Sequence, residues 1–124
     1  MKSIETKNAP APIGPYSQAT IAGGLVFVSG QVGKNAVSGA MINDTIKNEA
    51  RQVMENVKAV LEAAGSNLSK VAKTTIFLTN MDDFAQVNEV YGSFFTGNYP
   101  ARETVQVSRL PLNANVEISV IAEL

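Results

Sequence analysis

The chain has 124 residues and a mass of 13.2 kDa; 45% of its residues are hydrophobic, 17% are charged, and its net charge is -1. This composition excludes a disordered or fibrous protein, and we expect one globular domain over residues 1–124. The slightly acidic balance offers no basic surface for phosphate backbones, so nucleic acid is not the expected partner. No apolar run reaches membrane-spanning length and no apolar signal region follows Met1, so we expect a cytoplasmic protein without a membrane partner.

The chain contains neither cysteine nor histidine. Disulfides, thiolate nucleophiles, Ser-His or Cys-His catalytic pairs and zinc sites built from these residues are therefore excluded. Any proton transfer must rely on carboxylates, Lys, Tyr, Ser, Thr, the backbone or water.

The first part of the chain predicts four extended segments, at residues 3–5, 8–15, 17–22 and 25–29. Prolines keep the second of these out of a helix. Gly23 and Gly24, between the last two, indicate a tight hairpin. An irregular loop containing Gly and Asn then follows Gln31 as far as about Asn43.

Residues 44–64 give the clearest helical pattern. Asp44 or Thr45 can cap its start, and Gly65 suits a left-handed residue at its end. Apolar side chains recur at helical spacing and form one stripe: Ile46, Ala50, Val53, Met54, Val57, Val60, Leu61 and Ala64.

Residues 71–79 are rich in β-branched side chains and predict another strand. A second helix is predicted from residue 81 to about 95, with Phe84, Val87, Tyr91 and Phe94 facing inward. Asp82 and Asp83 are acidic enough to suggest a metal site, but capping at the helix start explains them better.

Two runs near the C-terminus, residues 102–107 and 116–121, alternate as strands do. Val105 and Val107 of the first run, with Val116, Ile118 and Val120 of the second, are expected to face the helices. Arg102 and Glu117 would then lie together on the opposite face of the sheet.

The predicted order is strand, strand, helix, strand, helix, strand, strand. It indicates an α+β fold in which two helices cover one face of a mixed sheet. Phe27, Phe77 and Ile121 fall on the other face, which we therefore expect to meet a ligand or another subunit.

Seven short motifs occur in order along the whole chain: IGPYSQA (13–19), VSGQ (28–31), AVLEAAG (59–65), VAKTTIFL (71–78), FAQVNEVY (84–91), PAR (100–102) and VEISVIA (116–122). As an ordered set they resemble the RidA/YjgF family of reactive intermediate deaminases. The resemblance implies a chorismate-mutase-like (YjgF-like) fold, a homotrimer with clefts between subunits, and neither metal nor cofactor. It also implies hydrolysis of 2-imino acids, released by pyridoxal-phosphate-dependent dehydratases, to 2-oxo acids and ammonia.

The same resemblance implies roles for individual residues. Arg102 corresponds to an arginine that binds the substrate carboxylate, and Glu117 to a glutamate that holds or activates the attacking water. The remaining cleft residues implied to contact the substrate or shape its site are Tyr16, Ser29, Gly30, Asn88 and Thr104. Thr104 replaces the usual Cys, but the position's backbone carbonyl is thought to matter more, so activity is expected to survive.

Other interpretations remain open at this point. Arg102 and Glu117 could form only an ion pair, and Tyr16, Ser29 and Asn88 could serve turns, backbone groups or loops. A non-catalytic module that binds 2-oxo acids or related small carboxylates is the first alternative function. A role directed at protein or RNA is the second, although the lack of His counts against RNA cleavage.

Overall fold

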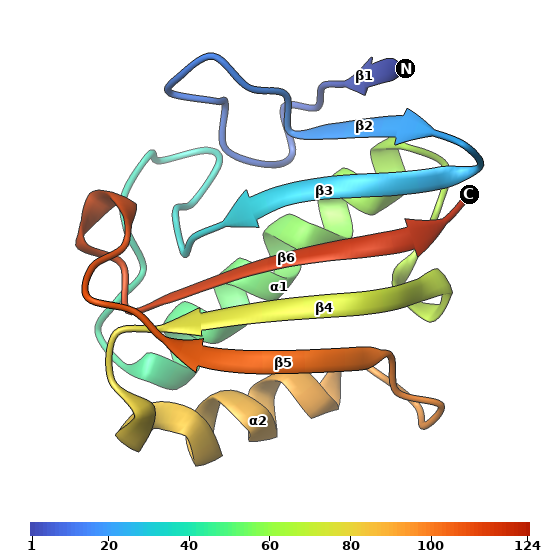
Figure 1. Cartoon of the computed structure of the whole chain (residues 1–124). Helices are drawn as coiled ribbons and strands as arrows, with labels where there is room; N and C mark the ends of the chain where they lie inside the picture. The colour runs from blue at the N-terminus through green and yellow to red at the C-terminus, as the bar shows by residue number, and fades with distance from the viewer.

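The computed structural model describes residues 1–124 and shows one sheet of six strands, in the order β1-β2-β3-β6-β4-β5 (Figure 1). The elements are β1 (Lys2–Ile4), β2 (Ala19–Ala22), β3 (Leu25–Gln31), α1 (Ile46–Ala63), β4 (Val71–Leu78), α2 (Phe84–Ser93), β5 (Ala101–Gln106) and β6 (Val116–Glu123). Strands β4 and β5 are parallel and every other pair is antiparallel. The predicted α+β fold with a mixed sheet is confirmed.

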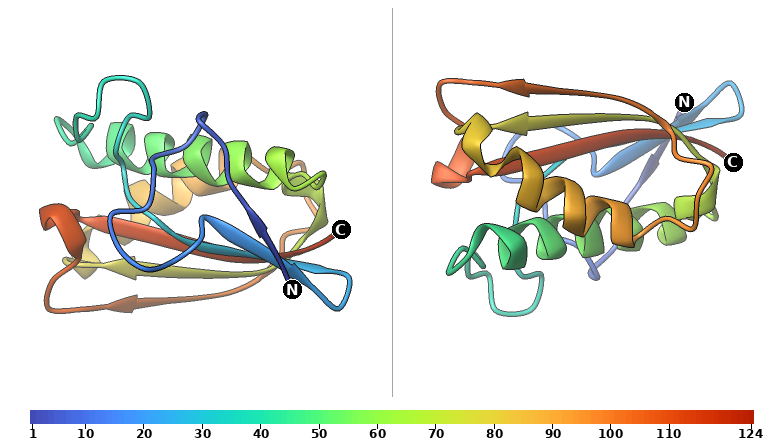
Figure 2. Two further views of the ribbon diagram at one scale, coloured as in Figure 1. Left: turned by 90° about the horizontal axis from the view of Figure 1, so that it is seen from above. Right: turned by 90° about the horizontal axis from the view of Figure 1, so that it is seen from below.

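Both helices pack on the same side of the sheet, as the two edge-on views show (Figure 2). Helix α1 starts where the sequence predicts, because the Thr45 side chain accepts a hydrogen bond from the Asn48 amide. It ends before Gly65, whose φ of +85° is the left-handed conformation expected there. None of the helices combines the length and apolar composition of a membrane span.

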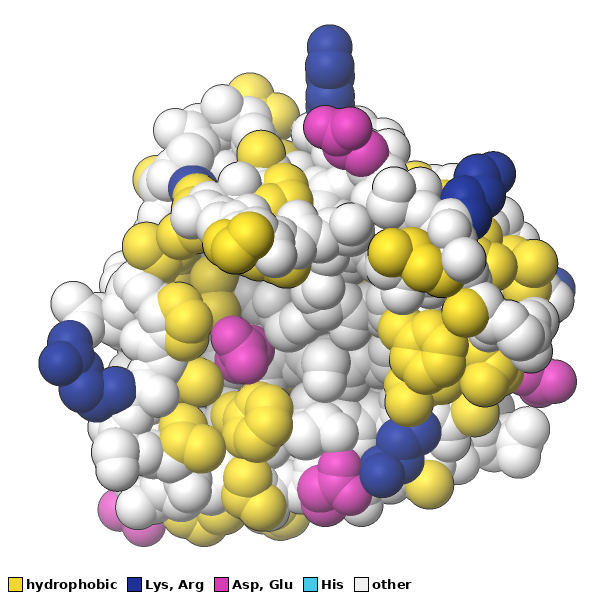
Figure 3. All heavy atoms as spheres, turned by 45° about the horizontal axis from the view of Figure 1, so that its top comes forward, with side chains coloured by type: hydrophobic (Ala, Val, Ile, Leu, Met, Phe, Trp, Pro, Cys, Tyr) yellow, Lys and Arg dark blue, Asp and Glu magenta, His cyan; other side chains and the backbone are white.

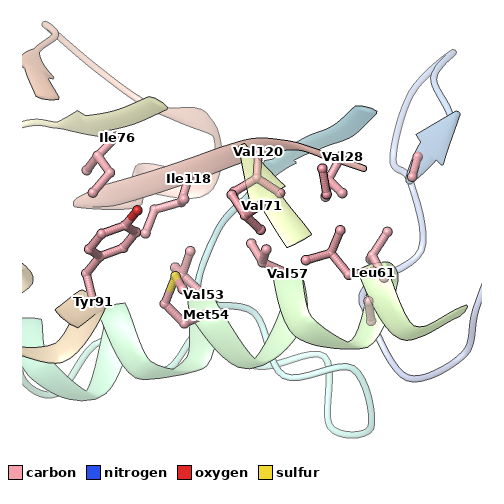
Figure 4. Close-up of a cluster of buried hydrophobic side chains, with 14 of the residues drawn as sticks. Val28, Val53, Met54, Val57, Leu61, Val71, Ile76, Tyr91, Ile118 and Val120 are labelled. Atoms are coloured by element: carbon pink, nitrogen blue, oxygen red, sulfur yellow. The ribbon is translucent and has the colours of Figure 1, made fainter. Parts of the chain in front are cut away.

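The core lies between α1 and the central strands. The predicted apolar stripe of α1 is almost wholly buried, and its members meet strand side chains from the other layer (Figure 4). The residues in contact across this layer include Val53, Met54, Val57, Leu61, Val28, Ile76, Ile118 and Val120. Each such side chain stabilises the fold by about 1.5–3 kcal/mol through burial, so this layer fixes the sheet on which the site is built.

The opposite face of the sheet has no helix over it (Figure 1). Phe27 stands opposite Ile121 in the register of β3 and β6, and Phe77 stands beside Val105 in that of β4 and β5. Phe27 remains 39% exposed and Val105 41% exposed. The predicted uncovered apolar face is thus present, and it extends to the edge of the sheet.

The predicted orientation of β5 is wrong. Arg102 pairs with Thr74 of the parallel neighbour β4, and Thr74 is fully buried beneath α2, where the Tyr91 hydroxyl donates a hydrogen bond to it at 2.9 Å. Arg102 therefore lies on the helical side, whereas Val105 lies on the open side. The alternation of apolar and polar residues does not by itself show which face of an edge strand meets the helices. Here Arg102 covers aromatic rings of α2, while Val105 extends the open apolar face.

The start of α2 also differs from the prediction. Phe84 is 37% exposed and lies outside the core, although Val87 and Tyr91 are buried as expected. The capping side chain is that of Asn80, which accepts from the Asp82 amide, and Asp83 makes no side-chain cap. The capping interpretation of the two aspartates is therefore corrected in favour of Asn80.

Two buried polar residues on α1 anchor loops that the sequence leaves irregular. Glu49 is fully buried, and its carboxylate accepts hydrogen bonds from the Asn115 backbone amide at 2.7 Å and the Asn115 side chain at 2.8 Å. The Asn56 amide donates to the carbonyls of Val32 at 3.0 Å and Lys34 at 2.9 Å. Helix α1 thus fixes both the chain entering β6 and the chain leaving β3.

Replacing Glu49 should test this anchoring. Glu49→Ala leaves the Asn115 donors without their acceptors, and we expect a loss of about 2–3 kcal/mol in the free energy of unfolding. Urea denaturation at a fixed protein concentration measures it. Glu55→Ala, on the exposed side of the same helix, should change stability by less than about 0.5 kcal/mol. Equal effects for the two variants would contradict the anchoring role.

Candidate functional site

A cavity of about 420 Å³ opens where the N-terminal loop, the end of β3 and the turn before β6 meet. It is lined by Pro10, Ala11, Ile13, Gly14, Tyr16, Ser29, Gly30, Gln31, Val32, Lys34, Pro111, Leu112 and Glu117. Figure 3 looks onto this side of the molecule and shows hydrophobic side chains on either side of a hollow, with an acidic side chain at its wall. Four of the predicted site residues, Tyr16, Ser29, Gly30 and Glu117, share this cavity.

Glu117 is the acidic group of the cavity. It projects from β6 on the open side of the sheet, where it pairs in register with Phe77. Its carboxyl group has no hydrogen-bond or ion-pair partner in the chain, and burial raises the pKa of Glu117 above its ordinary value of 4.5. A half-buried carboxylate without a partner is poised to accept a proton or to hold a water molecule.

The backbone beside Glu117 is shaped by an irregularity in β3. The register with β6 shifts between Val28 and Gln31, which is a bulge, and Gly30 lies within it. A Cβ atom on Gly30 would stand 2.7 Å from the Glu117 carboxyl carbon. Gly30 thus allows a close approach of the two strands here, since the side chain of any other residue would displace the carboxylate.

The two hydroxyl groups at the cavity differ in their bonding. Ser29 donates from Oγ to the Ser17 carbonyl at 2.6 Å, which is the structural role weighed for it, but its oxygen still faces the cavity as an acceptor. Tyr16 is 49% exposed, and its hydroxyl makes no hydrogen bond within the chain. Tyr16 thus offers a free donor at the cavity mouth.

Arg102 belongs to a second cluster, formed by β5 and α2. Its Nη1 donates to Asn88 Oδ1 at 2.7 Å, and its guanidinium carbon lies 5.2 Å from the centre of the Tyr91 ring and 5.7 Å from that of Phe84. A shallow groove joins Arg102 and Asn88 to Tyr99. Amide and aromatic contacts orient the guanidinium but leave its charge uncompensated, as a carboxylate-binding group requires.

Thr104 lies on the same side of β5 as Arg102, two residues further along the strand. Its Oγ1 is buried and has no hydrogen-bond partner in the chain. A buried hydroxyl without a partner is costly, so this atom is available to a ligand, a water or another subunit.

The predicted site residues therefore form two clusters on opposite faces of the sheet. The expectation that Arg102 and Glu117 lie together is wrong for a single chain, because β5 is turned the other way. They do not form an ion pair either: the only ion pairs are Lys47–Glu89 and Lys73–Glu103. Glu103 faces away from Arg102, because it bonds Lys73 and Thr75 on the open side.

The cavity also contains residues that the sequence did not reveal. Lys34 comes from the irregular loop after β3, where no periodic pattern indicates a side chain's direction. Leu112 lies in the turn before β6 with a φ of 59°, a left-handed conformation that is uncommon for a leucine. No group of three or more acidic side chains is placed to hold a metal ion.

Comparison with known proteins places this arrangement in a family. The model of the family described as Endoribonuclease L-PSP matches residues 6–124. A 2-iminobutanoate/2-iminopropanoate deaminase of Salmonella typhimurium is 46% identical over 124 residues, covering 98% of this chain and 96% of that protein. A RutC family protein of Pyrococcus horikoshii is 50% identical over 119 residues, covering 96% of this chain and 94% of that protein.

Solved structures agree with these sequence relatives. The crystal structure of E. coli TdcF with bound serine superposes with a TM-score of 0.96 at 42% identity, covering 100% of this chain and 98% of that one. That of the E. coli YjgF gene product gives a TM-score of 0.95 at 43% identity, covering 99% and 98%. The chain thus has the fold that its sequence motifs imply, and it belongs to the Endoribonuclease L-PSP family, also called the RidA/YjgF family.

Proposed function

We propose that this protein is a 2-iminobutanoate/2-iminopropanoate deaminase. Relatives of this name are 45–48% identical to it. The observation that carries the proposal is the unpartnered, half-buried Glu117 carboxylate at the wall of a cavity that also presents the Tyr16 and Ser29 oxygens. The chemistry needs little more, because a protonated imine is already electrophilic and requires mainly an oriented water.

Glu117 would accept a proton from the water as its oxygen bonds to the imine carbon. The C=N bond becomes a single bond and a carbinolamine forms. The nitrogen then takes the proton back from Glu117, and the C–N bond breaks as the carbon–oxygen double bond of the 2-oxo acid forms. The hydroxyl proton passes to the departing ammonia, which leaves as ammonium. Each turnover consumes one water and returns Glu117 to its carboxylate form.

We further propose that the site is completed between copies of the chain in a homotrimer. Glu117 and Arg102 face opposite sides of one sheet. An Arg102 side chain can therefore reach a substrate held at Glu117 only if it belongs to a second copy of the chain. The exposed apolar face, with Phe27 and Val105, supports an assembled state. Arg102, with Asn88 and Thr104 beside it, would bind the substrate's carboxylate from the neighbouring subunit.

Mixing two inactive variants tests this arrangement. Arg102→Ala and Glu117→Gln should each abolish turnover alone. After co-refolding in equal amounts, about a quarter of the sites should combine an intact Glu117 with an intact Arg102, because each is present with a probability of one half. About a quarter of wild-type activity is therefore expected, measured as suppression of semicarbazone formation when threonine dehydratase generates the imine and semicarbazide traps it.

In the control, each variant is refolded separately and the two are then mixed. No activity should return in this mixture until the assemblies exchange subunits. Failure to regain activity in verified mixed assemblies would place both residues in the same subunit's site. Loss of the oligomer in Arg102→Ala would instead support a structural role for that residue. Wild-type protein that is folded and assembled but does not accelerate imine hydrolysis would refute the deaminase itself.

The pH dependence of the rate should report on Glu117. Its carboxylate form is the active one, so turnover falls as pH decreases through its folded pKa. Because burial raises that pKa, the acid limb should lie above pH 4.5. The measurement is kcat/KM from about pH 4 to about pH 8, corrected for uncatalysed hydrolysis and compared with Glu117→Asp. A profile that stays flat on the acid side would remove Glu117 from the proton-transfer step.

A non-catalytic binding module is the second candidate, and one observation favours it. The E. coli TdcF structure holds serine, an amino acid that retains its carboxylate but has no imine. Saturable binding of 2-oxobutanoate without any effect on semicarbazone formation would support this candidate. The RNA-directed role suggested by the family's description is weaker, because the cavity offers a carboxylate and no imidazole for proton transfer.

A further inference from the structure

Lys34 is the second charged residue of the cavity. Among the thirteen lining residues only Lys34 and Glu117 carry charge, and they have opposite signs. The Lys34 ammonium makes no ion pair or hydrogen bond in the chain, and it is not within ion-pair distance of Glu117. The two charges therefore occupy separate parts of the same cavity, and neither neutralises the other.

The backbone at Lys34 is held firmly, although it lies in a loop. The buried Asn56 amide binds the Lys34 carbonyl at 2.9 Å, and the Lys34 amide donates to the Val32 carbonyl at 2.9 Å. A bridge to Met41 closes the loop on its other side. These bonds fix the position from which the lysine side chain starts.

Gly33 helps to set which side chains line the cavity. A Cβ atom there would stand 2.9 Å from the Glu49 side chain of α1, so this residue packs against the helix. Its two neighbours, Val32 and Lys34, both line the cavity. The helix thus packs against the glycine while the lysine and valine line the substrate space.

Apolar residues make up much of the rest of the cavity lining, among them Ile13, Val32 and Leu112. The volume of about 420 Å³ is that of a single chain, and the neighbouring copy proposed above would occupy part of it. A substrate with a longer side chain that ends in a negative charge would lie along these apolar residues and meet the Lys34 ammonium.

We propose that Lys34 binds a second carboxylate at the end of the substrate side chain, so that dicarboxylic 2-imino acids are preferred substrates. This inference rests on the proposed deaminase function. The imine would lie at Glu117, the side-chain methylenes along the apolar walls, and the distal carboxylate at Lys34. The hydrogen bond from the Lys34 ammonium to the distal carboxylate would be charge-assisted.

The experiment compares two classes of imine in the semicarbazide assay. D-Aspartate oxidase supplies 2-iminosuccinate from D-aspartate and 2-iminoglutarate from D-glutamate, and threonine dehydratase supplies 2-iminobutanoate. We expect wild-type protein to have the higher kcat/KM for at least one dicarboxylic imine. In Lys34→Met, the ratio of dicarboxylic to monocarboxylic kcat/KM should fall about tenfold, as loss of one hydrogen bond to a charged group predicts.

Two controls separate this effect from a general loss of charge or shape. Lys34→Arg keeps the cation and should retain most of the preference. Lys58→Met removes a cation from the exposed side of α1 and should leave the ratio unchanged. An unchanged ratio in Lys34→Met would overturn the proposal.

If the protein hydrolyses no imine, the deaminase function is refuted. The role of Lys34 can then still be tested by measuring binding. Calorimetric titration with 2-oxoglutarate, oxaloacetate and 2-oxobutanoate then measures binding alone. About tenfold tighter binding of a dicarboxylate by wild type than by Lys34→Met would support the role of Lys34. Equal affinities in the two proteins would exclude it.

Discussion

The alternation of side chains across the three strands β6, β4 and β5 is the constraint on which the rest of the molecule depends. Their register places Glu117 on the open face with Phe77, and Arg102 on the helical face with Thr74. A sheet cannot bring these two side chains together without a slip of one residue, which would also expose its buried residues. Both charges therefore stay uncompensated within one chain. This is the reason for the proposal that one site combines Glu117 of one copy with Arg102 of another.

Buried polar residues convert this sheet into a shaped site. Glu49 and Asn56 project from the same helix, and each bonds a loop that lines the cavity, one before β6 and the other after β3. A buried polar group stabilises the fold only when all its hydrogen bonds are formed. The bonds of Glu49 and Asn56 therefore hold each loop in one position. The left-handed Leu112 lies within the first of these loops, where the bonds to Glu49 support a strained residue.

The sequence predicted those features whose cause is local. Thr45, Gly65 and the apolar stripe define α1, and the φ angles of Gly23 and Gly24, +60° and +77°, suit the predicted hairpin. The predicted direction of the β5 side chains was wrong, because that direction depends on the neighbouring strand. Nor did the sequence predict the buried Glu49, because a polar residue at the edge of a helical stripe is normally solvated until a partner such as Asn115, distant in sequence, is known.

In a chain without histidine or cysteine, the charged groups of the cavity are the Glu117 carboxylate and the Lys34 ammonium. The half-buried Glu117 carboxylate has no partner, which raises the energy of the empty protein. The Lys34 ammonium in the same cavity also has no partner, but its residue is partly exposed. A ligand whose own charges match them relieves the cost at Glu117 and gains a charged partner at Lys34. Under this proposal, selectivity follows from the spacing between the two charges. A ligand that meets only Lys34 leaves the half-buried Glu117 carboxylate without a partner, and that penalty acts against the wrong ligand.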